Sequence, residues 1–294
     1  MKIQYGPLVD IFERKSIRHY QPQLIEDELL LKFQEYSQNV LKLDESNKFF
    51  LDTYTYSAHN KYSKALGNFG WIMSPPHFFV PYIVGNFFAL TDLGFRVQQM
   101  VLEMWRQRVG SCYIGCVHRQ QKVKKILGLP QEACLSAFVV FGKPDINSPE
   151  RLYRKISQIF TRSHRRISLR DLFLDSSWRD LGDPKNFVYQ VVEAGRFAPS
   201  AVNAQPWKFR IENGDMAVFA KINQVKKLYD LYQDYPLHDV GLCMANMSMA
   251  AGGMGYELKW RLAHKPVEEK INGQRVIRIA AFSMKGLGGN NDKH

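Results

Sequence analysis

Two long apolar segments of the chain begin with the same Asp-x-Gly pattern, and the two copies stand 147 positions apart. The first copy is Asp92-Leu93-Gly94, within residues 88–110, and the second is Asp239-Val240-Gly241, within residues 238–260. Each segment has the length and apolar content of a buried helix. Because similarity at a fixed spacing is typical of repeated architecture, we predict two similar halves, residues 1–165 and 166–294. The alternative is two unrelated domains of similar composition.

The elements around these two helices recur in a similar order. In the first half, apolar periodicity and turn residues predict helices over 26–43, 88–110 and 118–129, and strands over 48–56, 77–85 and 134–144. In the second half they predict helices over 184–197 and 238–260, and strands over 206–211, 215–221 and 273–284. The dipeptide Asn213-Gly214 favours a tight hairpin turn between two of these strands.

Net charge and cysteine usage narrow the function classes. The chain has 294 residues, a formal net charge of +12 and 45% hydrophobic residues, so a sizeable core and an anionic partner are both expected. The basic residues are scattered and the aromatic residues form no base-stacking module, so we expect no nucleic acid. Four cysteines without a Cys-x-x-Cys pair indicate free thiols and no metal. No apolar leader or unbroken membrane span is evident, and a cytoplasmic protein that binds no membrane is expected.

The first candidate ligand-binding segment lies near the N-terminus. Arg14, Lys15, Ser16 and Arg18 place three cations and a hydroxyl within five residues. In an extended segment, Arg14, Ser16 and Arg18 would lie on one side. Such a cluster suits a phosphate, which favours charged and forked donors. The alternative is an ordinary solvated basic segment.

A second candidate is the stretch from Pro199 to Pro206, which occurs once in the chain. It combines small side chains with the hydroxyl of Ser200 and the amides of Asn203 and Gln205. A planar heteroaromatic ligand needs this combination, because its ring must approach the backbone closely while its edge finds donors and acceptors. The alternative is a helix-to-strand loop whose polar side chains bond their own backbone.

A third candidate surrounds the predicted helix 118–129. Gly110, Gly115 and Pro130 mark turns beside a helix start, where backbone N–H groups could face a ligand. Ordinary glycine punctuation between elements is the alternative.

Taken together, the stretches ERKSIRHY, TDLGFRVQQMVLEMWRQRVGSCYIG, GLPQEACLSAFVVFGKP and EAGRFAPSAVNAQPWKF resemble the FMN-dependent nitroreductase family. The most specific part is residues 198–207, and the next is residues 14–18. This resemblance implies an α+β fold with two repeats, each a mainly antiparallel sheet flanked by helices. It also implies FMN as cofactor and NADH or NADPH as electron donor.

The chain departs from the family pattern in one respect. Members are usually homodimers in which each flavin contacts both subunits, whereas here the basic start lies in the first half and the Pro-Ser-Ala loop only in the second. Residues 44–47 leave no room for such a loop in the first half. The chain is therefore similar to the single-chain tandem nitroreductases, an internal pseudo-dimer that keeps one of two sites. We expect a monomer.

The resemblance transfers binding roles to individual positions. It implies that Arg14, Lys15, Ser16 and Arg18 bind the phosphate and ribityl chain, and that Pro199, Ser200 and Ala201 pack on the flavin ring. The remaining expected cofactor-binding residues are Asn203, which shapes the loop with Gln205, the turn at Gly115 and Cys116, and Arg165 and Arg166. Glu132 and Ala133 are a weaker match. Arg165 and Arg166 match either the cation that closes the phosphate site or a decayed second copy of the basic start.

The expected activity is that of an FMN-dependent oxidoreductase. A hydride would pass from NAD(P)H through flavin N5 to an electron-poor small molecule such as a nitroaromatic or a quinone, so no catalytic side chain is assigned. Asp92 opens a predicted helix and is interpreted as a cap. The alternatives are a flavin-binding protein without turnover and a specialised flavin reductase or dehydrohalogenase.

Overall fold

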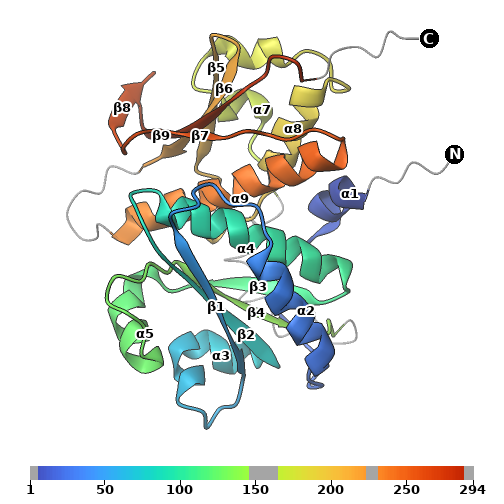
Figure 1. Ribbon diagram of the computed structural model, residues 1–294, viewed down its shortest axis with the longest axis vertical. Helices are drawn as coiled ribbons and strands as arrows, with labels where there is room; N and C mark the ends of the chain where they lie inside the picture. The colour runs from blue at the N-terminus through green and yellow to red at the C-terminus, as the bar shows by residue number, and fades with distance from the viewer. Residues whose placement is uncertain (1–5, 146–164, 223–230, 288–294) are drawn as a thin grey trace, which may run out of the picture.

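The computed structural model describes residues 6–145, 165–222 and 231–287, which form two antiparallel sheets and the helices that cover them (Figure 1). Two long helices, α4 (Ala89–Arg106) and α9 (Leu231–Gly253), cross the middle of the molecule between the sheets. All strand pairs within the two sheets are antiparallel.

The first sheet consists of β1 (Lys48–Thr55), β2 (His77–Val84), β3 (Gly110–Gly115) and β4 (Ala137–Gly142), in the order β1-β2-β4-β3. The second consists of β5 (Trp207–Glu212), β6 (Asp215–Lys221), β7 (Arg261–Leu262) and β9 (Gln274–Ser283), in the order β5-β6-β9-β7, with β8 (Glu268–Ile271) also paired to β9. The turn between β5 and β6 has positive φ at Asn213 (54°) and Gly214 (79°), as that dipeptide predicts.

The two sheets repeat one plan. Each is preceded by a helix, α2 (Asp27–Gln38) or α8 (Phe187–Arg196), then has two strands, a long helix and the remaining strands. The first half inserts α5 (Gln120–Leu127) between its last two strands, where the second half inserts β8. The predicted α+β fold with two sheets is therefore confirmed. The proposed division at residue 165 adjoins residues 146–164, outside the described part of the chain, and stays a prediction.

Shorter helices complete the described chain. These are α1 (Gly6–Glu13), α3 (Asn68–Met73), α7 (Leu169–Leu172), η1 (Tyr62–Leu66), η2 (Val117–Arg119), η4 (Ser176–Leu181) and η5 (Ala201–Asn203). Although α1 comes first in the chain, it packs on the second half: Leu8 and Ile11 join a cluster with Ala194 of α8. Phe12 meets Phe197 edge to face at 4.8 Å. The basic segment that follows α1 therefore starts beside the second half.

The crossing of α4 and α9 depends on two glycines. A Cβ on Gly94 would collide with the carbonyl oxygen of His238, and a Cβ on Gly241 would collide with that of Thr91. These contacts are reciprocal, because His238 and Gly241 stand 147 positions after Thr91 and Gly94. Such exchange of contacts is characteristic of a two-fold interface. The glycines of the repeated Asp-x-Gly pattern thus allow the two backbones to touch.

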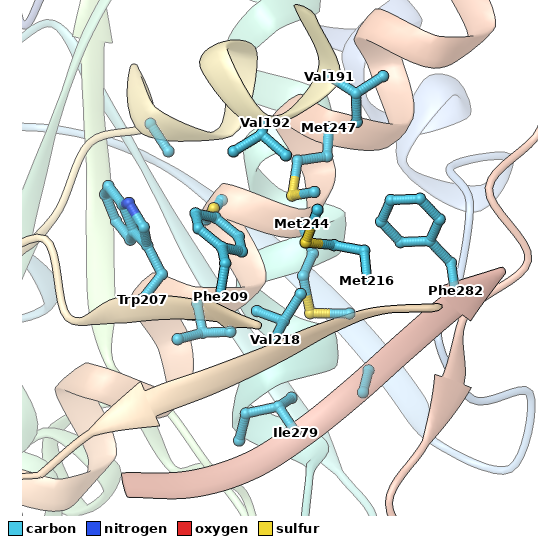
Figure 2. Packing of buried hydrophobic residues seen from close by; sticks show 14 of the residues in the cluster. Val191, Val192, Trp207, Phe209, Met216, Val218, Met244, Met247, Ile279 and Phe282 are labelled. Carbon is cyan, nitrogen blue, oxygen red and sulfur yellow. The ribbon is translucent and has the colours of Figure 1, made fainter. Parts of the chain in front are cut away.

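The second half has the larger core, formed where α8 and α9 cover one face of the second sheet (Figure 2). The side chains that meet there include Val191, Val192, Trp207, Phe209, Met216, Val218, Met244, Met247, Ile279 and Phe282. Each fully buried side chain of this size contributes roughly 1.5–3 kcal/mol. In the first half, α2 and α4 supply Phe33 and Leu93 to a corresponding cluster with Phe79 and Phe141 of the sheet.

Several sequence expectations about helices were wrong. The helix predicted over 238–260 begins at Leu231 and ends at Gly253, and the one predicted from Pro184 begins at Phe187. The helix predicted to reach residue 43 ends at Gln38, because polar side chains bind the following backbone instead: Gln99 bonds the N–H (2.9 Å) and the carbonyl (3.0 Å) of Leu41. Asp92 is not a cap, because the N-cap position is Phe88. Its buried carboxylate accepts from the N–H of Leu43 at 2.9 Å.

Candidate functional site

The basic segment runs along the edge of the first sheet. Ser16 forms a parallel bridge with Ser111, and the N–H of Ile17 donates to the Ser111 carbonyl at 2.9 Å. Because β3 is the last strand in the sheet order, the segment extends that edge. Backbone pairing with β3 thereby fixes the position of the basic segment, which is one of the two predicted parts of the site.

Arg14, Ser16 and Arg18 gather around the thiol of Cys112 in β3. Burial raises the pKa of this thiol, whereas Arg18 and Arg14 lower it by their charge and the side chains of Ser16 and Arg18 lower it by hydrogen bonds. The three alternate residues therefore lie together, as the extended pattern predicts. Lys15 is exposed.

The loop from Pro199 to Gln205 is held by hydrogen bonds and is strained. The N–H of Ala201 donates to the Asp239 carboxylate at 2.9 Å, and the N–H of Gln205 donates to the Ser200 hydroxyl at 2.9 Å. Val202 has a φ of 46° although it is β-branched, and its side chain is 87% exposed. A β-branched residue rarely adopts this conformation, and such strain persists only where surrounding contacts enforce it.

Arg166 is bonded to this loop by two hydrogen bonds. Its guanidinium donates to the side-chain oxygen of Asn203 at 2.7 Å and to the carbonyl of Phe197 at 3.0 Å. Arg165 contributes its backbone, whose carbonyl accepts from the side chains of Asn203 (2.9 Å) and Gln205 (3.0 Å). The side chain of Arg165 is exposed. Arg166 therefore lies at the second-half loop, and its role at a phosphate site stays a prediction.

Three arginines from the two halves approach one another here. The pKa of Arg166 falls to about 10, first because it is buried and then because Arg14 and Arg196 lie nearby. Arg196 is paired with Glu193 (Nε to Oε2, 2.7 Å). No carboxylate among the described residues lies within ion-pair distance of Arg14. The cluster therefore carries excess positive charge, which an anion would compensate.

Tyr113 and Asp239 lie between the basic segment and the loop. Burial raises the pKa of Tyr113; the charge of Arg14 lowers it and that of Asp239 raises it, so both groups are close. Burial also raises the pKa of Asp239, while His238, 3.6 Å away, and the N–H of Ala201 oppose that shift. Sequence reasoning assigned no role to either residue. The repeated Asp-x-Gly pattern marked Asp239 but gave no indication of its partner.

The predicted turn at Gly115 and Cys116 faces the second half but offers few free donors. The N–H of Cys116 donates to the carbonyl of Ser136 at 2.8 Å, and that of Val117 donates to the hydroxyl of Tyr235 at 3.3 Å. Tyr235 also packs directly on Gly115. Burial raises the pKa of Tyr235 to about 12, so the hydroxyl is neutral. The structure thus brings this turn to α9, with its amides engaged within the protein.

The other expectations from the sequence concern features outside this cluster. Glu132 is exposed, and Ala133 is buried with its N–H on the carbonyl of Pro130. Within the described ranges, no three His, Cys, Asp or Glu side chains are grouped to hold a metal ion. In the same part of the chain, no helix is both long and apolar enough to cross a bilayer.

Comparisons with known proteins agree with the fold. Among solved structures, one described as a putative nitroreductase from Thermotoga maritima matches with a TM-score of 0.54 and 16% identity, covering 93% of each chain. The NADPH:FMN oxidoreductase from Vibrio harveyi matches at 20% identity and a TM-score of 0.43, over 48% of this chain and 70% of that one. Nitroreductase A from Vibrio parahaemolyticus matches at 20% identity and 0.42, over 55% and 77%. No curated protein matches the chain.

The match to Thermotoga maritima spans almost the full length of both proteins, so their folds share both halves. The two Vibrio proteins correspond to about half of this chain. Among protein families, residues 8–251 match the one described as "Putative TM nitroreductase". That span includes the basic segment, the loop, α4 and nearly all of α9, and on this evidence the chain belongs to that nitroreductase family.

Proposed function

We propose that the chain is an FMN-dependent oxidoreductase that uses NADH or NADPH to reduce an electron-poor small molecule, such as a nitroaromatic or a quinone. Membership of a nitroreductase family supports oxidoreductase chemistry. When bound, FMN would supply that chemistry by accepting a hydride at N5 from the nicotinamide and passing it to the acceptor. The protein's part is to bind and orient the participants.

The observation that carries this proposal is the proximity of Arg14 and Arg166. Each comes from a different half, and the pKa of Arg166 is lowered first by burial and then by the positive charges of Arg14 and Arg196. A phosphate would reverse this repulsion, and arginine guanidinium groups bind phosphate oxygens with paired, charge-assisted hydrogen bonds. We therefore assign the FMN phosphate to Arg14 and Arg166, with Lys15, Ser16 and Arg18 in the same segment.

The loop would supply the flat surface for the flavin ring. Pro199, Ser200 and Ala201 have small side chains, so the backbone can approach an aromatic ring closely. Hydrogen bonds from Arg166 and to Asp239 hold the loop before a ligand arrives, which reduces the ordering cost of binding. This fit supports FMN as the resident group.

Fluorescence titration of ligand-free protein with FMN tests the proposal. We expect tight quenching at one flavin per chain, because one half alone has the loop, and a monomer by light scattering. Arg14→Gln should raise the dissociation constant at least tenfold, since a charge-assisted hydrogen bond is lost (about 1.5–3 kcal/mol). Arg170→Gln removes one exposed charge four residues after Arg166 and is the matched control. Equal effects of both variants, or two flavins per chain, would contradict the assignment.

Ser200→Trp tests the loop separately. The bulky ring would fill the space assigned to the flavin and break the bond to Gln205, so FMN binding should be lost. Ser46→Trp places the same side chain in the exposed corresponding region of the first half and should leave affinity unchanged. Retained affinity in Ser200→Trp would remove the loop from the site.

Flavin binding without turnover is the second candidate, and Tyr235 favours it. Its hydroxyl accepts a hydrogen bond from the N–H of Val117, and its ring packs against Gly115. Tyr235 therefore already occupies the side of this turn that faces α9. Following NADH and NADPH oxidation with and without a quinone separates the two functions. Catalytic turnover supports the oxidoreductase. Bound FMN that neither nucleotide reduces would instead support the binding protein.

A further inference from the structure

A chain of hydrogen bonds crosses the molecule beneath the candidate site. The hydroxyl of Tyr113 in β3 donates to the side-chain oxygen of Gln98 in α4 at 3.0 Å. The amide nitrogen of Gln98 donates to the side-chain oxygen of Asn246 in α9 at 2.8 Å. The amide nitrogen of Asn246 donates to the carbonyl of Ala194 in α8 at 3.0 Å. Four elements from both halves are connected in this way.

These hydrogen bonds are buried, so losing one of them should cost free energy. Gln98 is 0% exposed and Asn246 1%, so water cannot replace a lost partner. A buried polar group without a partner costs free energy, whereas one in a satisfied network defines a single arrangement. Each amide accepts at its oxygen and donates at its nitrogen, so the chain runs in one direction from Tyr113 to Ala194.

Both ends of the chain lie at the candidate site. Tyr113 is close to Arg14 and Asp239, and its raised pKa keeps the hydroxyl protonated as a donor. Ala194 belongs to the last turn of α8, from which the chain enters the loop. The network therefore connects the wall beside the basic segment with the base of the loop.

The first half uses the equivalent position differently. Gln99 stands 147 positions before Asn246, and its amide bonds both the N–H and the carbonyl of Leu41 in its own half. Asn246 bonds Ala194 on one side and Gln98 of the other half on the other. Asn246, which bonds the end of α8 before the second-half loop, thus also depends on a residue of the first half. Gln99, which bonds the first-half loop at Leu41, has no such partner in the bonds given above.

We propose that Tyr113, Gln98 and Asn246 are positioning residues that fix residues 197–206 relative to the basic segment of the first half. The network sets the distance between the two parts of the site before any ligand is present. Its expected effect on FMN affinity rests on the proposed function above, but its effect on loop order does not.

Hydrogen exchange of the ligand-free protein tests loop order directly. In Gln98→Leu and Asn246→Leu we expect exchange over residues 195–206 to rise at least tenfold, with residues 41–47 unchanged, because each substitution removes two buried hydrogen bonds. Gln99→Leu is the matched control and should show the reverse pattern. Where a leucine variant fails to fold, Tyr113→Phe removes only the hydroxyl that starts the network. Unchanged exchange over 195–206, or an equal rise in both regions, would overturn the proposal.

Affinity for FMN gives the second measurement. Gln98→Leu and Asn246→Leu should bind FMN about tenfold more weakly than Gln99→Leu at similar thermal stability. If the unaltered protein binds no FMN while the exchange pattern holds, the proposed function fails and the positioning role stands. If affinity falls equally in all three variants, the effect follows general stability, and the positioning role is rejected.

Discussion

Asp92 and Asp239 occupy equivalent positions in the two halves, yet their carboxylates have different surroundings. Asp92 pairs with Arg96 at 2.6 Å and also accepts from Leu43 (2.9 Å) and from the side chain of Asn47 (3.0 Å). Asp239 accepts from Ala201 at 2.9 Å and has His238 at 3.6 Å. Both carboxylates hold the backbone of the loop before the first strand of their half.

The residue one turn further along the helix explains the difference. Arg96 in the first half corresponds to Cys243 in the second, 147 positions later. The guanidinium of Arg96 also donates to the carbonyl of Asp44 at 3.0 Å, so it holds the short first-half loop by a hydrogen bond within that half. The second half lacks this internal cation; Arg166 instead bonds the side chain of Asn203 in the loop and lies near enough to Arg14 to feel its charge. The first half thus holds its loop with an internal ion pair, whereas the second half has none at the equivalent position.

Replacing Asp92, whose carboxylate pairs with Arg96, should have the largest effect on stability. Asp92→Asn leaves the buried Arg96 without its counter-charge, and we expect the free energy of unfolding to fall by about 3–5 kcal/mol. Urea unfolding followed by circular dichroism measures this loss. Asp239→Asn is the matched control at neutral pH, because asparagine still accepts from Ala201 and leaves no cation unpaired. Losses of similar size in both variants would contradict the distinction between the halves.

Substitutions at the crossing of α4 and α9 should instead cost similar amounts of stability in the two halves. Gly94→Ala and Gly241→Ala each place a methyl group against a backbone carbonyl of the other helix, and each should cost about 1–3 kcal/mol. Gly252→Ala is the control: it lies in α9 with open space around it, and a gain of roughly 0.5–1 kcal/mol is expected because alanine favours helix. A large cost at one glycine alone would show that the crossing is not symmetric in energy. Thermal unfolding of the three variants provides the comparison.

Features of the fold and of the candidate site could be predicted from the sequence where they depend on neighbouring residues, and not where they depend on residues far apart in the chain. Apolar periodicity and the turn at Asn213 are local signals, and they predicted most of the long helices and strands. The predicted joint site of the basic segment and the loop depended on the family resemblance, and it stays a prediction, although Arg14 lies near enough to Arg166 to lower its pKa. Strand β3 was missed, because its six residues from Gly110 to Gly115 include two glycines and suggested a turn.

Features set by distant partners could not be read from the sequence. The early end of α2 depends on Gln99, which lies 58 positions from Leu41. The engagement of the turn by Tyr235 depends on a residue 118 positions from Val117. Such contacts require the crossing of α4 and α9, whose geometry no local pattern specifies. The repeated glycines indicated equivalent helices but not that they touch.

The smallest expected effect concerns the pH dependence of Asp239. Burial raises its pKa in the folded protein, so folding favours the protonated carboxyl. The unfolded protein then binds fewer protons between the ordinary aspartate pKa, about 4, and the raised folded value, and stability falls as pH rises through that interval. Asp239→Asn removes this dependence. We therefore expect the variant to gain stability over the unaltered protein as pH rises above about 4, by less than in the comparisons above.

Urea unfolding at a series of pH values checks this expectation. The groups that face Asp239, His238 on α9 and Tyr113 on β3, are present in both proteins, so the difference between them reports the carboxyl together with its coupling to these two groups. A variant that instead loses stability as pH rises would show that the ionised carboxylate is favoured by folding. In that case the bond to Ala201 would outweigh burial, and the second half would hold its loop by charge as the first half does.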